Sequence, residues 1–310
     1  MSGEAPLRGS RPWDGRTRSG LGIRLMFWLF RVCGPVFAYS LLYPVVFYYM
    51  CVAWRHGAAS RDYLRRLYPT ATALRLLWLT YRHFLSFGRV LLDRAYAFTG
   101  ALGTFHFERV NSESITEALK EGKGLILISA HMGNWELAAH GLGSLGVTAP
   151  AVPINLVWFR NEGQRAQQHL EKVTQGQPFN IIDSSDPLAA SIEMVAALKR
   201  GEIVAIHGDR VVGSGTVKAP FLGAEAEFPS GPYVVAANTG APVVFVFCNR
   251  LGHKRYRVTA VGPRSFAFTS RREREANLRQ WAGEYALILE QQLREFPLQW
   301  HNFYRFWGAP

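Results

Sequence analysis

The sequence predicts an α/β protein with a mainly parallel, mixed sheet flanked by helices, preceded by an N-terminal membrane helix. From about residue 104 onward, short runs rich in β-branched and aromatic residues alternate with helical stretches, which is typical of parallel strands joined by helices. Before that point, the 22 residues from Val32 to Ala53 include no charged side chain. That is about the length of helix that crosses a ~30 Å hydrocarbon core.

Composition limits the class of protein further. The 310 residues are 48% hydrophobic and 19% charged, enough apolar material for one large α/β domain plus an appendage. The formal net charge is +12, which favours anionic partners such as phospholipid head groups, phosphorylated substrates, an acidic carrier protein or nucleic acid. Nucleic acid fits least, because the arginines are scattered and no recognition motif accompanies them.

The three cysteines, Cys33, Cys51 and Cys248, form no C-x-x-C pair and lack partnered histidine spacing. Neither a disulfide framework nor a zinc site is therefore predicted. The bulk of the chain is expected in a reducing compartment.

The N-terminal part divides by composition. Residues 1–21, rich in Gly, Ser, Pro and Arg, are predicted to be a mobile basic tail, and residues 22–55 a membrane anchor that Pro35 and Pro44 kink. The uncharged run exceeds a signal-peptide core of roughly 7–15 residues and is apolar all round. A cleaved signal peptide, a buried core helix and a helix half inserted in one leaflet are the alternatives. Arginines flank both sides, so topology is not fixed.

Residues 56–310 are predicted to form the main domain. Residues 60–100 are expected to be helical, with a face that contacts either lipid head groups or other helices. Strands are expected at 124–130, 149–154, 178–183, 202–207, 242–248 and 255–261, and helices at 163–175, 187–200, 230–239 and 270–296.

His131 follows the predicted strand 124–130, and Glu136 comes five residues later. On one continuous helix these positions would face about 140° apart. If the strand ends at Ala130 and Asn134 caps a new helix, the chain doubles back and Glu136 can reach the imidazole. A histidine that abstracts a proton while a carboxylate orients its other nitrogen is a general base, although a histidine beside a carboxylate is also commonly structural.

Two other chemistries fit His131 less well. Ser129 lies two residues before it, but the chain has no G-x-S-x-G elbow for a serine nucleophile. A metal site from His131, Glu136 and His140 does not match the common ligand spacings. No metal site is predicted.

Asp209 and Arg210 follow the predicted strand 202–207, so they should converge with His131 at the carboxyl edge of the sheet. The guanidinium of Arg210 can bind a phosphate or a developing oxyanion, or form a salt bridge with Asp209. We place Arg210, Asp209 and Asn134 among the candidate substrate-binding residues. The aromatic tail 297–307 is expected to pack on the core, with an acyl groove as the alternative.

These features together resemble the superfamily of lysophospholipid and lipid A acyltransferases. The blocks "SAHMGNWELAAHG", "GDR", "APFLGAEAEFPSGP" and "TGAPVVFVF" occur in the order of its late lipid A (lauroyl/myristoyl) branch. The resemblance covers roughly residues 22–308 and includes the H-x4-E spacing. At the end of the chain, "PLQWHNFYRFW" is more similar to relatives found with other lipid or polyene pathways, which leaves the acceptor open.

The resemblance implies a glycerolipid acyltransferase-like fold, with His131 as general base and Glu136 as its partner. It further implies transfer from acyl carrier protein or acyl-CoA to a hydroxyl of a lipid or glycolipid, without a metal or redox cofactor. The expected place is the inner membrane, with the catalytic domain facing the cytoplasm. A non-catalytic lipid-binding or assembly protein of the same fold is the alternative class.

Overall fold

The structure is a computed structural model, which describes residues 21–137, 152–158, 179–211 and 215–308. The chain divides into two compact units, residues 1–85 with 302–310 and residues 86–301. Residues 56–85 thus belong with the N-terminal helices, whereas the sequence places a boundary at residue 55. The predicted tail lies almost wholly outside the described residues.

Helices make up the first unit. They are α1 (Leu21–Val52), α2 (Trp54–Leu67) and the first half of α3 (Ala73–Tyr96), which continues into the second unit. Gly34 interrupts α1 with φ 76° and ψ 172°, a conformation that glycine adopts readily, and Pro35 follows it. In the described part of the chain, no single helix is long and apolar enough to cross a membrane. The bent pair Val36–Val52 and Trp54–Leu67, at 96°, passes the same test together.

The predicted single membrane helix is therefore not confirmed, since a break at Gly34 and a sharp bend after Val52 replace one straight span. The C-terminal residues of the first unit pack as predicted. Phe303 is buried and stacks on His83 at 4.7 Å, and Arg66 lies over the ring of Trp307 at 4.3 Å.

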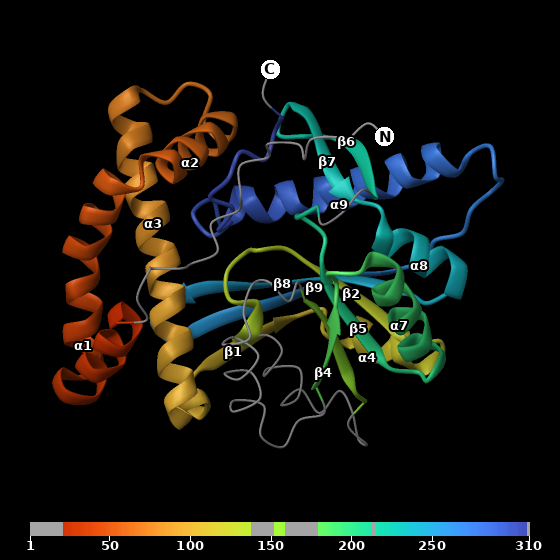
Figure 1. Ribbon diagram of the computed structural model, residues 1–310, viewed down its shortest axis with the longest axis horizontal. Helices are drawn as coiled ribbons and strands as arrows, with labels where there is room; N and C mark the ends of the chain where they lie inside the picture. The colour runs from red at the N-terminus through yellow and green to blue at the C-terminus, as the bar shows by residue number, and fades with distance from the viewer. Residues whose placement is uncertain (1–20, 138–151, 159–178, 212–214, 309–310) are drawn as a thin grey trace, which may run out of the picture. The chain divides into compact units, whose positions relative to one another are not determined.

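A seven-stranded sheet organises the described part of the second unit (Figure 1). The spatial order is β1-β9-β8-β2-β5-β3-β4. All neighbours are parallel except β8 and β9, which form an antiparallel pair, so the predicted mainly parallel, mixed sheet is confirmed. The strands are β1 (His106–Val110), β2 (Leu125–Ser129), β3 (Ile154–Trp158), β4 (Phe179–Asp183), β5 (Ile203–His207), β8 (Val243–Gly252) and β9 (Arg255–Arg264).

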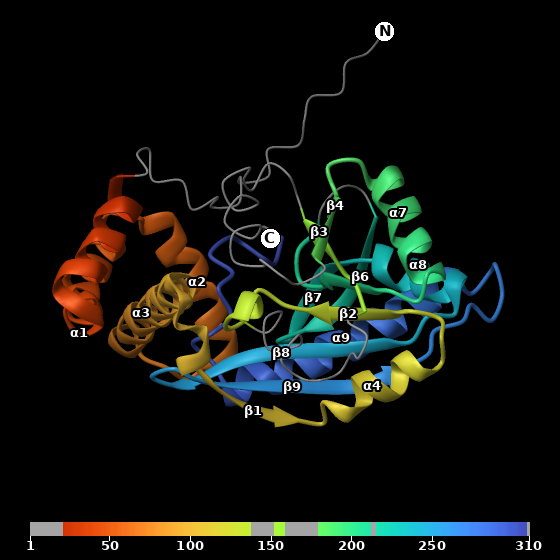
Figure 2. The same cartoon turned by 90° about the horizontal axis from the view of Figure 1, so that it is seen from below.

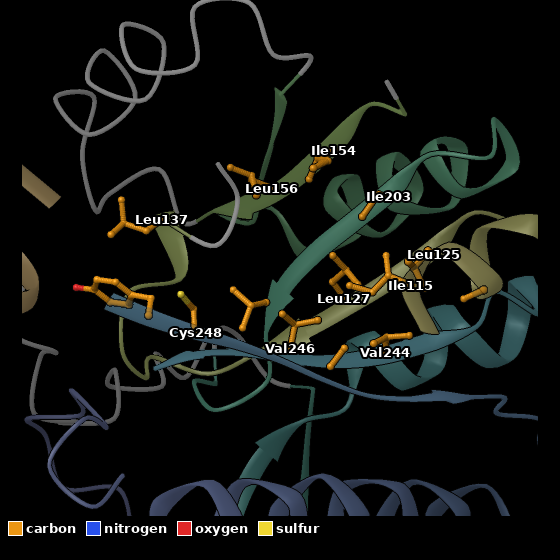
Figure 3. Packing of buried hydrophobic residues seen from close by; sticks show 14 of the residues in the cluster. Ile115, Leu125, Leu127, Leu137, Ile154, Leu156, Ile203, Val244, Val246 and Cys248 are labelled. Atoms are coloured by element: carbon orange, nitrogen blue, oxygen red, sulfur yellow. The ribbon is translucent and has the colours of Figure 1, made fainter. Parts of the chain in front are cut away.

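The first four residues of strand β2 are apolar and buried, as expected for a central parallel strand with both faces covered. Leu125 and Leu127 pack in one cluster with Ile115 of α4 (Glu113–Lys120) (Figure 3). On β8, beside β2, Phe245 packs against Tyr285 of α9 (Arg274–Glu295), with ring centroids 5.7 Å apart. Figure 2 shows β9, β8 and β2 side by side.

Two other helices have capping residues that are typical of helix ends. Asp186 caps α7 (Pro187–Lys199) by accepting from the backbone N–H groups of Leu188 and Ala189. Helix α8 (Gly231–Thr239) ends at Gly240, whose φ is 68°. A π-helical turn (Ala97–Ala101) and a 3₁₀ turn (Leu102–Thr104) follow α3.

Some elements differ from the prediction. Two strands that are not among those expected from the sequence, β6 (Thr216–Phe221) and β7 (Ala224–Pro229), form an antiparallel hairpin, in which β6 alternates exposed and buried residues. The edge strand β1 was not predicted, and most of its residues are exposed. The strand expected at 149–154 begins at Ile154, and the helix expected at 163–175 lies outside the described residues.

Candidate active site

The candidate site lies at the carboxyl edge of two adjacent parallel strands. Ser129 ends β2 and pairs with His207, which ends β5. The segments that leave these strands carry His131 and Asp209. Open α/β sheets commonly bind ligands at this edge, and here the edge brings together residues 78 positions apart.

Asp209 holds His131 through two hydrogen bonds. The backbone N–H of His131 donates to Oδ2 at 2.8 Å, and the ring Nδ1 lies 2.8 Å from Oδ1. Trp300 donates its indole N–H to Oδ2 at 2.7 Å. The predicted convergence of Asp209 with His131 is confirmed.

The Asp209 carboxyl is completely buried. Burial alone would raise its pKa, but the charge of His131 and the hydrogen bonds from His131 and Trp300 outweigh that effect and hold the pKa well below its usual range. An ionised carboxylate can only accept, so Nδ1 of His131 donates, and Nε2 is left with a lone pair. Nε2 is therefore the nitrogen that can take a proton from a substrate.

The loop after His131 is fixed by its backbone. Gly133 donates to Gln299 O at 2.8 Å and Asn134 donates to Cys248 O at 2.9 Å, while His301 donates to His131 O at 2.8 Å. A Cβ on Gly133 would lie 1.9 Å from Cys248 O, so only glycine fits between this loop and β8. The loop that carries His131 is thus hydrogen-bonded both to β8 and to the C-terminal segment.

Glu136 does not occupy the place predicted for it. Its Oε1 accepts from Nη1 of Arg94 at 2.7 Å, and its side chain is 8% exposed. The carboxylate on Nδ1 of His131 is Asp209, so the proposed orienting contact of Glu136 is corrected. The reason is topological: the parallel neighbour strand β5 delivers Asp209 directly beside β2, whereas α3 supplies a cation for Glu136.

Asn134 caps the helix that follows, as predicted, because its Oδ1 accepts from Leu137 N at 3.3 Å. Its Nδ2 donates to Val90 O at 3.4 Å, and the side chain is buried. Its substrate-binding role stays a prediction, with both polar atoms already used internally. Arg210 is partly buried directly after Asp209, and its role also stays a prediction.

The match to a family model adds to this geometry. A model described as bacterial lipid A biosynthesis acyltransferase matches residues 84–308. The chain belongs to this family. No curated protein matches it in a sequence search. The matched range includes every candidate site residue of this lipid A acyltransferase family member, and acyltransferase activity on a lipid is the function that the family indicates.

His207 gives this acyltransferase site a second imidazole. Its ring lies 4.1 Å from that of His131 between centroids, tilted by 33°, and 5.0 Å from the ring of Trp135 in an edge-on contact. Burial, followed by the charge of His131, lowers the pKa of His207 well below its usual range, with Arg210 adding to the effect and Asp209 opposing it. His207 is therefore neutral at physiological pH.

Donor atoms of His131, His207 and Asp209 lie within 4.8 Å of one another, a spacing that could hold a metal ion. Both oxygens of Asp209 already accept hydrogen bonds from His131 and Trp300. The carboxylate of Asp209 thus contacts the ring and the backbone of His131 and the indole of Trp300. Ser129, the alternative nucleophile, directs its Oγ to Ala130 O at 3.4 Å.

Sequence reasoning missed three contributors. His207 ends a strand that was predicted, directly before Gly208 and Asp209, so its position was a usable signal. Trp300 stood in a tail expected to pack on the core or, as the alternative, to line an acyl groove, and it is 1% exposed while also donating to Asp209. No local signal links Arg94 to Glu136, 42 residues further on.

Proposed function

We propose that the protein is a membrane-bound O-acyltransferase that moves a fatty acyl group from a thioester to a hydroxyl of a lipid or glycolipid, such as a lipid A precursor of lipopolysaccharide. The observation that carries the proposal is the hydrogen bond of His131 Nδ1 to the buried, ionised Asp209. It leaves Nε2 as a base in a protein whose family acts in lipid A biosynthesis.

The chemistry follows from this tautomer. Nε2 of His131 takes the proton of the acceptor hydroxyl as its oxygen attacks the thioester carbonyl. The tetrahedral intermediate collapses, the C–S bond breaks, and the imidazolium returns the proton to the thiolate. The products are an ester and a free thiol. Arg210 is the proposed donor to the oxyanion. A thioester is already activated, so no metal or redox cofactor is required.

We propose that Glu136 contributes by holding the start of its helix. A buried carboxylate paired with Arg94 fixes the segment that runs from His131 to Leu137. Glu136 is thus a positioning residue, without contact to the reacting atoms.

For the donor we propose acyl carrier protein, with acyl-CoA as the alternative. The net charge of +12 would steer an acidic carrier toward the protein, over a Debye length of about 8 Å at physiological salt. Comparing the two thioesters at matched chain length over a salt series tests this choice. Arg55→Ala, Arg65→Ala and Arg66→Ala should weaken carrier-dependent transfer, and Arg210→Ala should mainly lower turnover. Equal or better use of the CoA thioester at low salt would refute the carrier.

We propose that the first unit binds the inner membrane, with the catalytic unit facing the cytoplasm. Large apolar side chains are exposed on its helices: Val36 by 80%, Tyr48 by 64%, Trp54 by 64% and Trp78 by 57%. The guanidinium of Arg55 lies over the Trp54 ring at 5.2 Å, a pairing suited to the boundary between lipid and anionic head groups. Full release of the intact protein by carbonate and high salt would contradict membrane binding.

The decisive experiment is lipid mass spectrometry of cells with and without the protein. A gain of one acyl mass on one lipid class names the acceptor and the chain length. His131→Ala is the matched control, and it should abolish the gain while the protein still accumulates in membranes. A normal gain with folded His131→Ala protein would refute the base. Lipid binding with no mass gain would indicate a non-catalytic lipid-binding protein.

A further inference from the structure

His207 has a feature that packing alone does not explain. Its Nδ1 is buried, and among the described residues it has no hydrogen-bond partner. Native proteins keep few such atoms, because a polar group loses its hydrogen bonds to water on burial. An apolar side chain at the end of β5 would avoid this loss. Because Nδ1 itself has no partner in the described ranges, the contacts of the ring rather than of its nitrogen indicate what the side chain does here.

We propose that His207 is a positioning residue for acyl transfer: its ring stacks on His131 and, together with Asp209, fixes the plane in which His131 presents Nε2. Asp209 holds one edge of the His131 ring by a 2.8 Å hydrogen bond, and His207 covers one face at 4.1 Å. The two contacts restrict different rotations of the same ring. Trp135 supports His207 from the side at 5.0 Å. The inference rests on the proposed role of His131 as base.

The neutrality of His207 suits this role. His131 becomes an imidazolium when it takes the hydroxyl proton, and the face of a neutral aromatic ring attracts a cation. A second imidazolium at the same place would repel it. Burial and the charges of His131 and Arg210 favour the uncharged form of His207, whereas the charge of Asp209 opposes them.

Two substitutions distinguish the contribution of the flat ring of His207 from that of its nitrogen atoms. His207→Phe keeps a flat ring against His131, whereas His207→Leu removes it. We expect His207→Leu to lower kcat about tenfold to a hundredfold with KM within about twofold, because a misplaced base affects the transition state more than binding. His207→Phe should keep kcat within about threefold. The readout is thiol release from the myristoyl thioester of acyl carrier protein, with a lipid A precursor as acceptor.

Phe268→Leu is the matched control. Phe268 is also partly buried, and its ring contacts are with Trp281, at 5.1 Å, and Arg274. Losing this ring removes a similar stacked contact elsewhere in the same unit, so kcat should stay unchanged. An equal loss in Phe268→Leu and His207→Leu would overturn the inference, as would a folded His207→Phe protein as inactive as His207→Leu.

A double-mutant cycle tests whether His207 and Asp209 act on the same ring. If they do, His207→Leu should cost less in an Asp209→Asn background than alone, because the ring has already lost its orientation. Independent effects that multiply would contradict the proposal.

A second readout needs no acyl substrate. Diethyl pyrocarbonate converts a neutral imidazole to its carbethoxy derivative, releasing carbon dioxide and ethanol, and peptide mapping reports the rate at His131. The His131 side chain is 20% exposed. Uncovering its face in His207→Leu should raise this rate severalfold, while His207→Phe should keep it low.

The controls separate this inference from the proposed function. Full activity of His131→Ala would refute the base assignment itself. Inactive His131→Ala beside a His207→Leu protein with normal kcat and an unchanged carbethoxylation rate would refute only the role of His207.

Discussion

Two buried carboxylates, one after β5 and one in the helix after β2, have opposite relations to His131. Asp209 is 78 positions away and accepts hydrogen bonds from both the backbone N–H and the imidazole of His131. Glu136 is five positions away and binds Arg94. Closeness in the sequence therefore does not decide which acid orients the base. The partner sets what each acid can do: Asp209 contacts the imidazole of the proposed base, and Glu136 is one end of an ion pair with Arg94.

The largest effect should come from removing His131, the residue that Asp209 binds. His131→Ala removes the proposed base and should lower transfer by about 10²–10⁴-fold, the usual range for a general base. It also leaves Asp209 buried without the imidazole, so the pKa of Asp209 should rise. Thiol release by the purified protein measures the loss, and a thermal melt shows whether the fold is kept. If the His131→Ala protein transferred acyl groups at a rate within twofold of the unaltered protein, His131 would not be the base, and its contact with Asp209 would no longer distinguish Asp209 from Glu136.

The next substitution compares the two acids directly. Asp209→Asn keeps the size of the side chain but removes the charge that fixes the tautomer of His131, so we expect a loss of about 10²–10⁴-fold in kcat, since losing the orienting carboxylate of a catalytic triad costs about 10⁴-fold. Glu136→Gln should cost roughly tenfold or less, because its partner is Arg94. Equal losses in both variants, measured as kcat on folded protein, would show that Glu136 also acts on the base.

The ion pair itself is the third target. Arg94→Gln and Glu136→Gln should each lower stability by about 1–3 kcal/mol, mainly through the buried group left without its partner. The value for Glu136→Gln belongs at the low end, since the Arg94 side chain that it leaves without a partner is 38% exposed and screened by solvent, whereas Arg94→Gln leaves the buried Glu136 carboxylate unpaired. In the double variant the losses should not add. Additive losses in urea unfolding would mean that the two side chains stabilise the protein separately.

The sequence was sufficient for the sheet because β2, β5 and β8 have apolar runs of strand length, and for the convergence of Asp209 with His131 because both follow adjacent parallel strands. It could not assign the partner of Glu136, since Arg94 comes from a helix whose register against the sheet leaves no local pattern. Trp300 was missed because it lies outside the helices and strands of the sheet, in a segment without a periodic pattern. The edge strand β1 was missed because most of its residues are exposed, so no buried period marks it.

The smallest effect concerns acid stability and belongs to His207. Its pKa in the folded protein lies well below its usual value because burial disfavours the charged ring, followed by the charge of His131. In the unfolded chain it takes a proton near pH 6.5. As the pH falls below about 6.5 the unfolded state therefore binds more protons than the folded state, and stability falls, by at most about 1.4 kcal/mol per pH unit for this one group.

Phenylalanine has no such proton, so His207→Phe should gain stability relative to the unaltered protein between about pH 7 and pH 5, with no gain above pH 7. Asp209 leaves this window unaffected because it is ionised throughout in both states. Histidines that do not contact His207 contribute equally to both proteins and cancel in the difference. Urea unfolding at several pH values gives that difference. A difference in unfolding free energy that stays constant with pH would show that His207 titrates alike in the folded and unfolded chain. The neutral ring of His207 would then no longer set the His131–Asp209 pair apart from the Glu136–Arg94 pair.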